Sequence, residues 1–217
     1  RGRFSRLALG LAGLAALGGV WLASPGLSAP AQTVAISVVT RPVPLDTEDP
    51  GRRSVGPLVY RGGLHVLSEA DGFGGYSGLR MLPDGRLLAI SDRGHWLVMR
   101  PVEEGGRLVG LSDAEMGPLL DEAGRPLASP AYDAEALEVI PHAGGLDVLV
   151  SFEGRHRIWR YAAPDPDAAQ TDDSADLLAA LRQTPQPVPG WLENWPGELT
   201  SNGGIEAMAV SESGAAL

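Results

Sequence analysis

The sequence predicts an all-β protein, more specifically part of a β-propeller. Glycine (29) and proline (18) are abundant among the 217 residues, which favours many turns and few long helices. Short apolar runs alternate with glycine-containing turns, and the order of runs and turns recurs along the chain. Four-stranded units that repeat in sequence are typical of propellers. A complete β-sandwich, with a coincidental likeness between its strands, is the alternative fold.

The first repeat unit lies in the middle of the chain. Residues 58–60 and 64–67 flank the turn Arg61-Gly62-Gly63, which predicts a hairpin. Four short apolar runs follow, and Pro83-Asp84-Gly85 is the turn between the first two. We expect these runs to form one four-stranded unit, with strands at residues 77–82, 87–91, 96–99 and 107–111.

The same order of strands then returns. Residues 135–140 match 77–82, residues 147–151 match the strand that ends at Ser91, and a third copy begins at Glu206. Two inserts, 112–133 and 162–203, lengthen the repeat. We therefore expect about two and a half four-stranded blades in a domain spanning 58–217, after an extended lead-in at 32–57. Because closed rings generally need at least four blades, we expect the chain to be the N-terminal part of a longer protein.

Residues 1–31 have the pattern of a targeting segment. Arg1, Arg3 and Arg6 precede an uncharged apolar run at 7–23, and small residues follow at 28–31. This order predicts a signal peptide, or a membrane anchor if the segment is not cleaved. We expect export to the periplasm or the medium, with membrane contact only through this segment.

The composition excludes several kinds of chemistry. The chain has no cysteine and no lysine, so it offers no thiol nucleophile, Schiff-base lysine or P-loop lysine. The net charge of −10 disfavours binding to nucleic acid. Carboxylates, arginines and histidines remain as the side chains available for a site.

Glutamates at equivalent points of the repeat are the candidate metal ligands. The innermost strands begin at Ser77, Glu135 and Glu206, and equivalent positions of a propeller lie on a ring around its axis. Carboxylates gathered near that axis would suit Ca²⁺, which prefers oxygen ligands. The alternative is structural, with each glutamate accepting hydrogen bonds from backbone amides of the next blade.

A second group pairs acids with arginines just past a strand end. Asp92 is followed by Arg93, and Glu153 is followed by Arg155 and Arg157. Arginine recognises phosphate and carboxylate through planar, paired donors, so these pairs are candidate catalytic or anion-binding residues. We predict Asp92, Arg93, Glu153 and Arg157 as the catalytic set. A structural ion pair is the alternative for each.

Several long motifs resemble one known family. The chain resembles the phytase-like propeller family described as having esterase-like activity of phytase, in the runs LVYRGGLHVLS, FGGYSGLRMLPDGRLLAISDRGHW, DAEALEVI, VSFEGRHRIWRY and SNGGIEAMA. The resemblance implies an exported bacterial β-propeller and a hydrolase of phosphate or other esters. It brings no settled catalytic residues with it.

Together these observations favour a metal-assisted hydrolase, with Ca²⁺ as cofactor and a small-molecule ester or phosphoester as substrate. Two alternatives stay open. The first is a non-catalytic propeller that binds a ligand or partner at the cell surface. The second is a lactonase-like propeller, which shares carboxylate-bound metal and differs in substrate.

Overall fold

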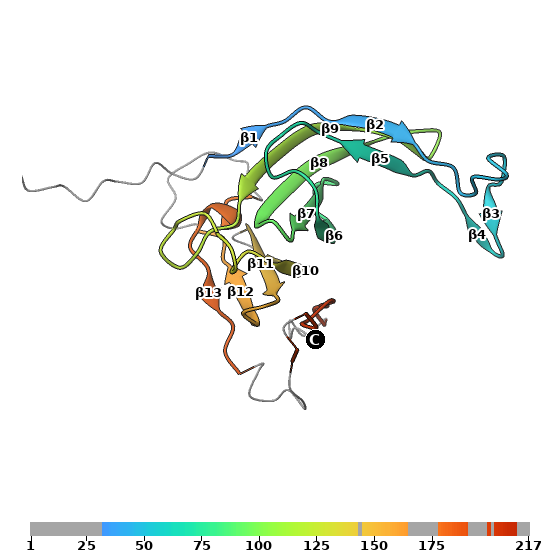
Figure 1. The fold of residues 1–217 in the computed structure, drawn as a ribbon. Helices are drawn as coiled ribbons and strands as arrows, with labels where there is room; N and C mark the ends of the chain where they lie inside the picture. The colour runs from blue at the N-terminus through green and yellow to red at the C-terminus, as the bar shows by residue number, and fades with distance from the viewer. Residues whose placement is uncertain (1–31, 143–144, 165–177, 191–198, 201, 212–217) are drawn as a thin grey trace, which may run out of the picture.

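A computed structural model describes residues 32–142, 145–164, 178–190, 199–200 and 202–211 (Figure 1). The targeting segment predicted at 1–31 lies outside these residues. The described part is all-β, with two larger antiparallel sheets and two small two-stranded ones. Its only helical element is the short 3₁₀ turn η1 (Ala180–Arg182). The all-β prediction is therefore confirmed.

The first sheet contains the four strands that the sequence predicts. They are joined in chain order, and an N-terminal strand adds to the outer edge beside the last of them, giving the order β1-β9-β8-β7-β6. The last strand runs further than predicted and takes up the beginning of the expected insert 112–133. The strands are β1 (Val34–Ala35), β6 (Tyr76–Met81), β7 (Leu87–Ser91), β8 (His95–Glu104) and β9 (Arg107–Pro118).

The second sheet repeats the same antiparallel order, β10-β11-β12-β13. Its first two strands are those predicted from the repeat. Its short fourth strand comes from within the insert expected at 162–203, so part of that insert completes the unit. The strands are β10 (Ala134–His142), β11 (Gly145–Phe152), β12 (Arg157–Tyr161) and β13 (Gln186–Pro187).

A bulge at the same place in both sheets fixes how the two units correspond. In β6 the pairing passes from Tyr76 to Gly78 and leaves Ser77 as the extra residue. In β10 it passes from Ala134 to Ala136 and leaves Glu135 as the extra residue. Ser77 and Glu135 are thus equivalent, as predicted. The partner strands correct the sequence match by one residue, because Ser91 pairs with Tyr76 whereas Phe152, not Ser151, pairs with Ala134.

The predicted hairpin around Arg61-Gly62-Gly63 is wrong. Strand β4 (Leu58–Val59) pairs with β3 (Ser54–Val55), and β5 (Leu64–Leu67) pairs with β2 (Val39–Pro42). The backbone groups around the turn bond elsewhere, because Tyr60 N–H donates to Arg53 C=O and Leu108 N–H donates to Arg61 C=O. Both flanking strands therefore take partners from the lead-in, which was expected to be merely extended.

The main core lies between the two larger sheets. Strand β10 lies against β6 and β7, and Figure 1 shows the sheets side by side. Alternate residues of each strand fill the space between them, as the period of two in a strand requires. The first sheet contributes Leu88, Ile90, Trp96 and Val98, and the second contributes Val148, Val150, Phe152, Trp159 and Tyr161.

The predicted third copy packs on the opposite face of the second sheet. Ser151 Oγ donates to Ile205 C=O at 2.7 Å, and Arg80 Nη2 donates to Met208 C=O at 2.8 Å. The Met208 side chain is buried with Ala136. Of the described residues in this copy, only Val210 takes part in a β-bridge, so it does not form the strand that the sequence predicts.

Candidate functional site

The strongest candidate site is a group of three carboxylates at one end of the second sheet. Asp133 immediately precedes β10, Glu135 is the bulged residue near its start, and Glu153 directly follows β11. The antiparallel pairing brings these ends together, and Glu153 N–H donates to Asp133 C=O at 2.8 Å. Bulges re-aim side chains and are over-represented next to active sites. The group therefore follows directly from the strand pairing.

The three carboxylates are close enough to share one cation. One oxygen from each of Asp133, Glu135 and Glu153 lies within 4.8 Å of the other two. Glu153 is buried, with 3% of its surface exposed, and the other two are half-buried. Within the described residues, no ion pair joins any of the three to an arginine or histidine. The site thus concentrates negative charge that no ion pair among the described residues offsets.

The neighbouring negative charges help to raise the proton affinity of Glu135. Burial and the neighbouring Asp133 carboxylate raise the pKa of Glu135 to about 7, and Glu153 and Glu206 act in the same direction. A hydrogen bond from the Ser77 side chain opposes the rise. Repulsion between carboxylates disfavours full ionisation, which a bound cation would reverse.

Backbone contacts fix the orientation of Glu153. Its Oε1 accepts a hydrogen bond from Gly204 N–H at 2.7 Å. A Cβ on Gly204 would stand 2.9 Å from Glu153 Cγ, so the close approach requires glycine there. The contact with Gly204 places the start of the third copy next to the carboxylate group. Glu206, an exposed residue of that copy, has its pKa raised by a hydrogen bond with Glu153.

The structure brings together some of the predicted site residues and adds Asp133 to them. Glu135 and Glu153, predicted for different roles, lie in the same group, and Glu206 lies beside it. Asp133 was missed as a site residue. The sequence shows an acid two residues before Glu135, but strand alternation does not apply there, because Asp133 precedes β10 and Glu135 is the bulged residue. Glu153, which was predicted as catalytic, accepts the Gly204 amide. The structural alternative for Glu135 and Glu206 stays an alternative.

Asp92 and Arg93 occupy the corresponding place in the first sheet. Asp92 N–H donates to Gly75 C=O at 2.8 Å, the counterpart of the bond between Glu153 and Asp133. Gly75 and Ser77 stand where the second sheet has Asp133 and Glu135, so only one of the three carboxylates is present. Arg93 Nη1 donates to Phe73 C=O. The catalytic roles of Asp92 and Arg93 stay predictions.

Arg157 is held by other contacts. Its guanidinium carbon lies 3.8 Å from the centre of the Phe152 ring and 4.2 Å from that of Trp159. It donates hydrogen bonds to the carbonyl oxygens of Arg155 and Ala131. None of these partners belongs to the carboxylate group, and the catalytic role of Arg157 also stays a prediction.

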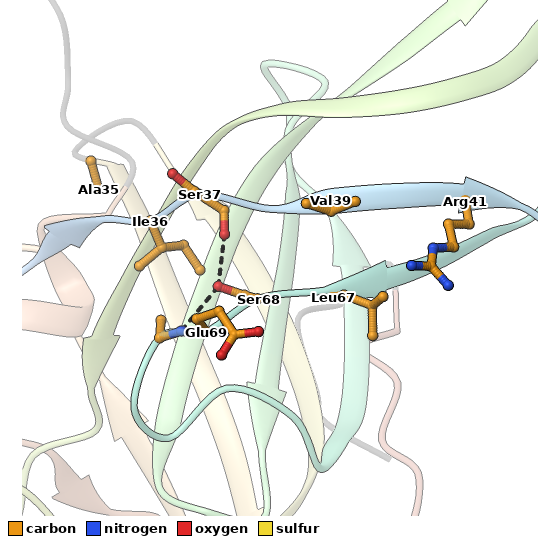
Figure 2. Close-up of a pocket in the computed structure, with 9 residues that line it drawn as sticks. Ala35, Ile36, Ser37, Val39, Arg41, Leu67, Ser68 and Glu69 are labelled. Atoms are coloured by element: carbon orange, nitrogen blue, oxygen red, sulfur yellow. Dashed lines mark hydrogen bonds between the residues drawn. The ribbon is translucent and has the colours of Figure 1, made fainter.

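A separate hollow of about 530 Å³ lies beside β2 and β5 (Figure 2). It runs from Ala35 at one end to Arg41 at the other. Ser68 is one of its lining residues, and its Oγ donates to Ser37 C=O at 2.7 Å and accepts from Ala70 N–H. None of the predicted site residues lines this hollow.

The fold and the carboxylate group define an all-β protein with a candidate metal centre. A family model described as phytase-like, with esterase-like activity of phytase, matches residues 71–217. The chain belongs to this family, as its motifs predict. Comparisons with curated proteins and with solved structures gave no match. Among the described residues, no helix is long and apolar enough to cross a membrane.

Proposed function

We propose that the chain is a metal-assisted hydrolase of phosphate or carboxylic esters, with its centre at Asp133, Glu135 and Glu153. The carboxylate group carries the proposal, because three carboxylates so close together, with no ion-pair partner among the described residues, suit a divalent cation such as Ca²⁺. Membership of the phytase-like family supports ester hydrolysis as the reaction. A bound divalent cation would supply Lewis-acid activation of an ester or phosphoryl oxygen.

The chain's own residues would orient this centre. Gly204 N–H holds one oxygen of Glu153, and the Ser77 side chain bonds Glu135 from the neighbouring sheet. Glu206, beside Glu153, would be a further ligand supplied by the third copy. In this proposal the predicted metal ligands Glu135 and Glu206 keep their role, and Glu153 moves from the catalytic set to the ligands.

We further propose that the two sheets are neighbouring blades of a β-propeller in an exported protein. The shared bulge at Ser77 and Glu135 supports equivalent blades. So does the order of packing, because β10 lies on the first sheet and the third copy lies on the second. Export is supported by the sequence pattern of residues 1–31 alone.

Hydrolysis of p-nitrophenyl phosphate and p-nitrophenyl acetate, with Ca²⁺ or with a chelator, tests the activity. We expect turnover with Ca²⁺ that is lost with the chelator and in Glu135→Gln, and retained in Glu104→Gln, which removes an exposed charge at the end of β8. Rates equal to buffer in every condition would overturn the hydrolase proposal. Metal binding without turnover would then favour the ligand-binding alternative.

A further inference from the structure

A pocket of about 600 Å³ lies between the β9–β10 connection and the turn that leads into β12. Leu127 and Trp159 supply part of its apolar lining, and three arginines also line it: Arg125, Arg155 and Arg157. This is an unusual concentration of positive charge in a chain whose net charge is −10. None of the three carboxylates of the candidate metal centre lines the pocket.

The charges of the three arginines are not equally compensated. Arg125 forms an ion pair with Asp121, with Nη2 and Oδ2 2.8 Å apart. In the part of the chain that the structure describes, Arg155 and Arg157 have no ion pair with any carboxylate. Glu122 lines the same pocket and attracts Arg157, but it forms no ion pair with it. Among its described lining residues, the pocket therefore holds two arginines without an ion pair against one such acid, Glu122.

Arg157 is already fixed in place. The Phe152 and Trp159 rings pack against its guanidinium, and two backbone carbonyls accept its hydrogen bonds. Burial lowers the pKa of Arg157 to about 10, and the nearby charge of Arg155 acts in the same direction. Two neighbouring guanidiniums, one of them half-buried, would be stabilised by an anion between or beside them.

Arg155 differs from Arg157 in being exposed at the pocket edge. No hydrogen bond from its guanidinium is seen to a described residue, so its donors are available to a ligand. A fixed arginine and an exposed one beside apolar side chains match the usual composition of a ligand pocket, in which a few polar groups fix the orientation and apolar contacts supply affinity.

We propose that this pocket binds an organic anion, that is, a phosphate or carboxylate group attached to an apolar body. The anionic group contacts Arg155 and Arg157, and the apolar body packs against Leu127 and Trp159. The proposal does not depend on the metal centre or on hydrolysis, since no carboxylate of that centre takes part.

Isothermal titration calorimetry of the full chain, with a chelator present throughout, tests this proposal. The probes are phenyl phosphate, benzoate and the uncharged benzyl alcohol. We expect binding of phenyl phosphate, benzoate or both, with benzyl alcohol at least about tenfold weaker, because it lacks the charge-assisted contacts. The comparison of the two anions identifies the preferred group.

Variants locate the binding. Arg155→Gln should weaken binding of the anion about tenfold or more, while Arg155→Lys should retain part of the affinity. The matched control is Arg107→Gln, which removes the same charge from an exposed residue at the start of β9. Failure of both anions to bind, or equal weakening in Arg155→Gln and Arg107→Gln, would overturn the proposal. Binding that requires Ca²⁺ in place of the chelator would also overturn it and would assign the anion to the metal centre.

Discussion

The Cβ of Leu137 lies 3.0 Å from the point that a Cβ on Gly78 would occupy. Strand β10 thus crosses β6 so closely that a Cβ at residue 78 would press on Leu137 and on Ile90, and these neighbours would have to shift. Gly78 and Ala136 are equivalent in the two sheets, and Met208 of the third copy is buried with Ala136. Each of these small residues therefore lies against the next copy of the repeat, Gly78 against the second and Ala136 against the third. Such a repeating contact is expected between neighbouring blades.

This packing predicts that shortening two equivalent leucines to alanine will destabilise the protein to different extents. Leu137 and Leu79 each lie two residues after the bulge of their strand. Leu137 is 1% exposed, whereas Leu79 is 51% exposed. Leu137→Ala should lower the free energy of unfolding by about 2–5 kcal/mol, as deletions in a packed core do. Leu79→Ala should lower it by about 1 kcal/mol or less. Urea unfolding measures both, and equal losses would contradict the packing described here.

A second prediction concerns Asp147, an almost fully buried carboxylate in β11. Its Oδ2 accepts from Arg160 Nε at 2.8 Å, and its Oδ1 lies 3.1 Å from His142 Nε2 and accepts from Ala163 N–H. Burial would raise the pKa of Asp147, but these partners outweigh it and hold the pKa below its ordinary value. Asp147→Asn should lower the free energy of unfolding by about 1–3 kcal/mol at pH 7.

The same carboxylate fixes the pH dependence of that loss. Because the folded-state pKa lies below the unfolded value of about 3.9, the stabilisation is complete above pH 5 and disappears as the pH falls through the folded-state pKa. The difference between wild type and Asp147→Asn should therefore shrink on acidification. Asp113→Asn, which changes an exposed partner of Arg100, is the control and should have little effect. A difference that stays constant down to pH 2 would refute this account of Asp147.

A third prediction concerns the backbone beneath Asp92. Gly75 has a φ of +65°, and a Cβ there would overlap the Asp92 carboxylate. Gly85 has a φ of +81° and no atom within 4 Å of such a Cβ. Alanine at either position carries the strain of a positive φ, but only Gly75→Ala adds a clash. Thermal unfolding should show a clearly larger loss for Gly75→Ala, and equal melting temperatures would contradict it.

Much of the fold can be predicted from the sequence, because the strands are short, apolar and separated by glycine turns. The runs at 77–82 and 87–91 become β6 and β7 with bounds shifted by at most one residue. The pairing of β4 and β5 with lead-in strands could not be predicted, since local turn chemistry at Gly62 and Gly63 says nothing about distant partners. Strand β13, which comes from the insert 162–203, could not be predicted for the same reason, because its pairing with β12 joins residues far apart in the sequence.

The site was predictable in part. Repeat position alone singled out Glu135, and its neighbourhood with Glu153 depends on the register of β10 with β11. Sequence adjacency suggested that Glu153 acts with the following arginines, but Glu153 faces the carboxylates while Arg157 packs on the Phe152 and Trp159 rings. Side chains four residues apart across a tight turn can face different surroundings, which spacing does not reveal.

We propose that Asp133, Glu135 and Glu153 together bind one divalent cation. Calorimetric titration of Ca²⁺ at pH 8 tests it directly, because this pH lies above the pKa of about 7 of Glu135 and that carboxylate is then mostly ionised. Wild type and the control Glu104→Gln should bind one Ca²⁺ with the same affinity, and Glu135→Gln should bind it at least about tenfold more weakly. No Ca²⁺ binding by wild type, or unchanged affinity in Glu135→Gln, would contradict the account.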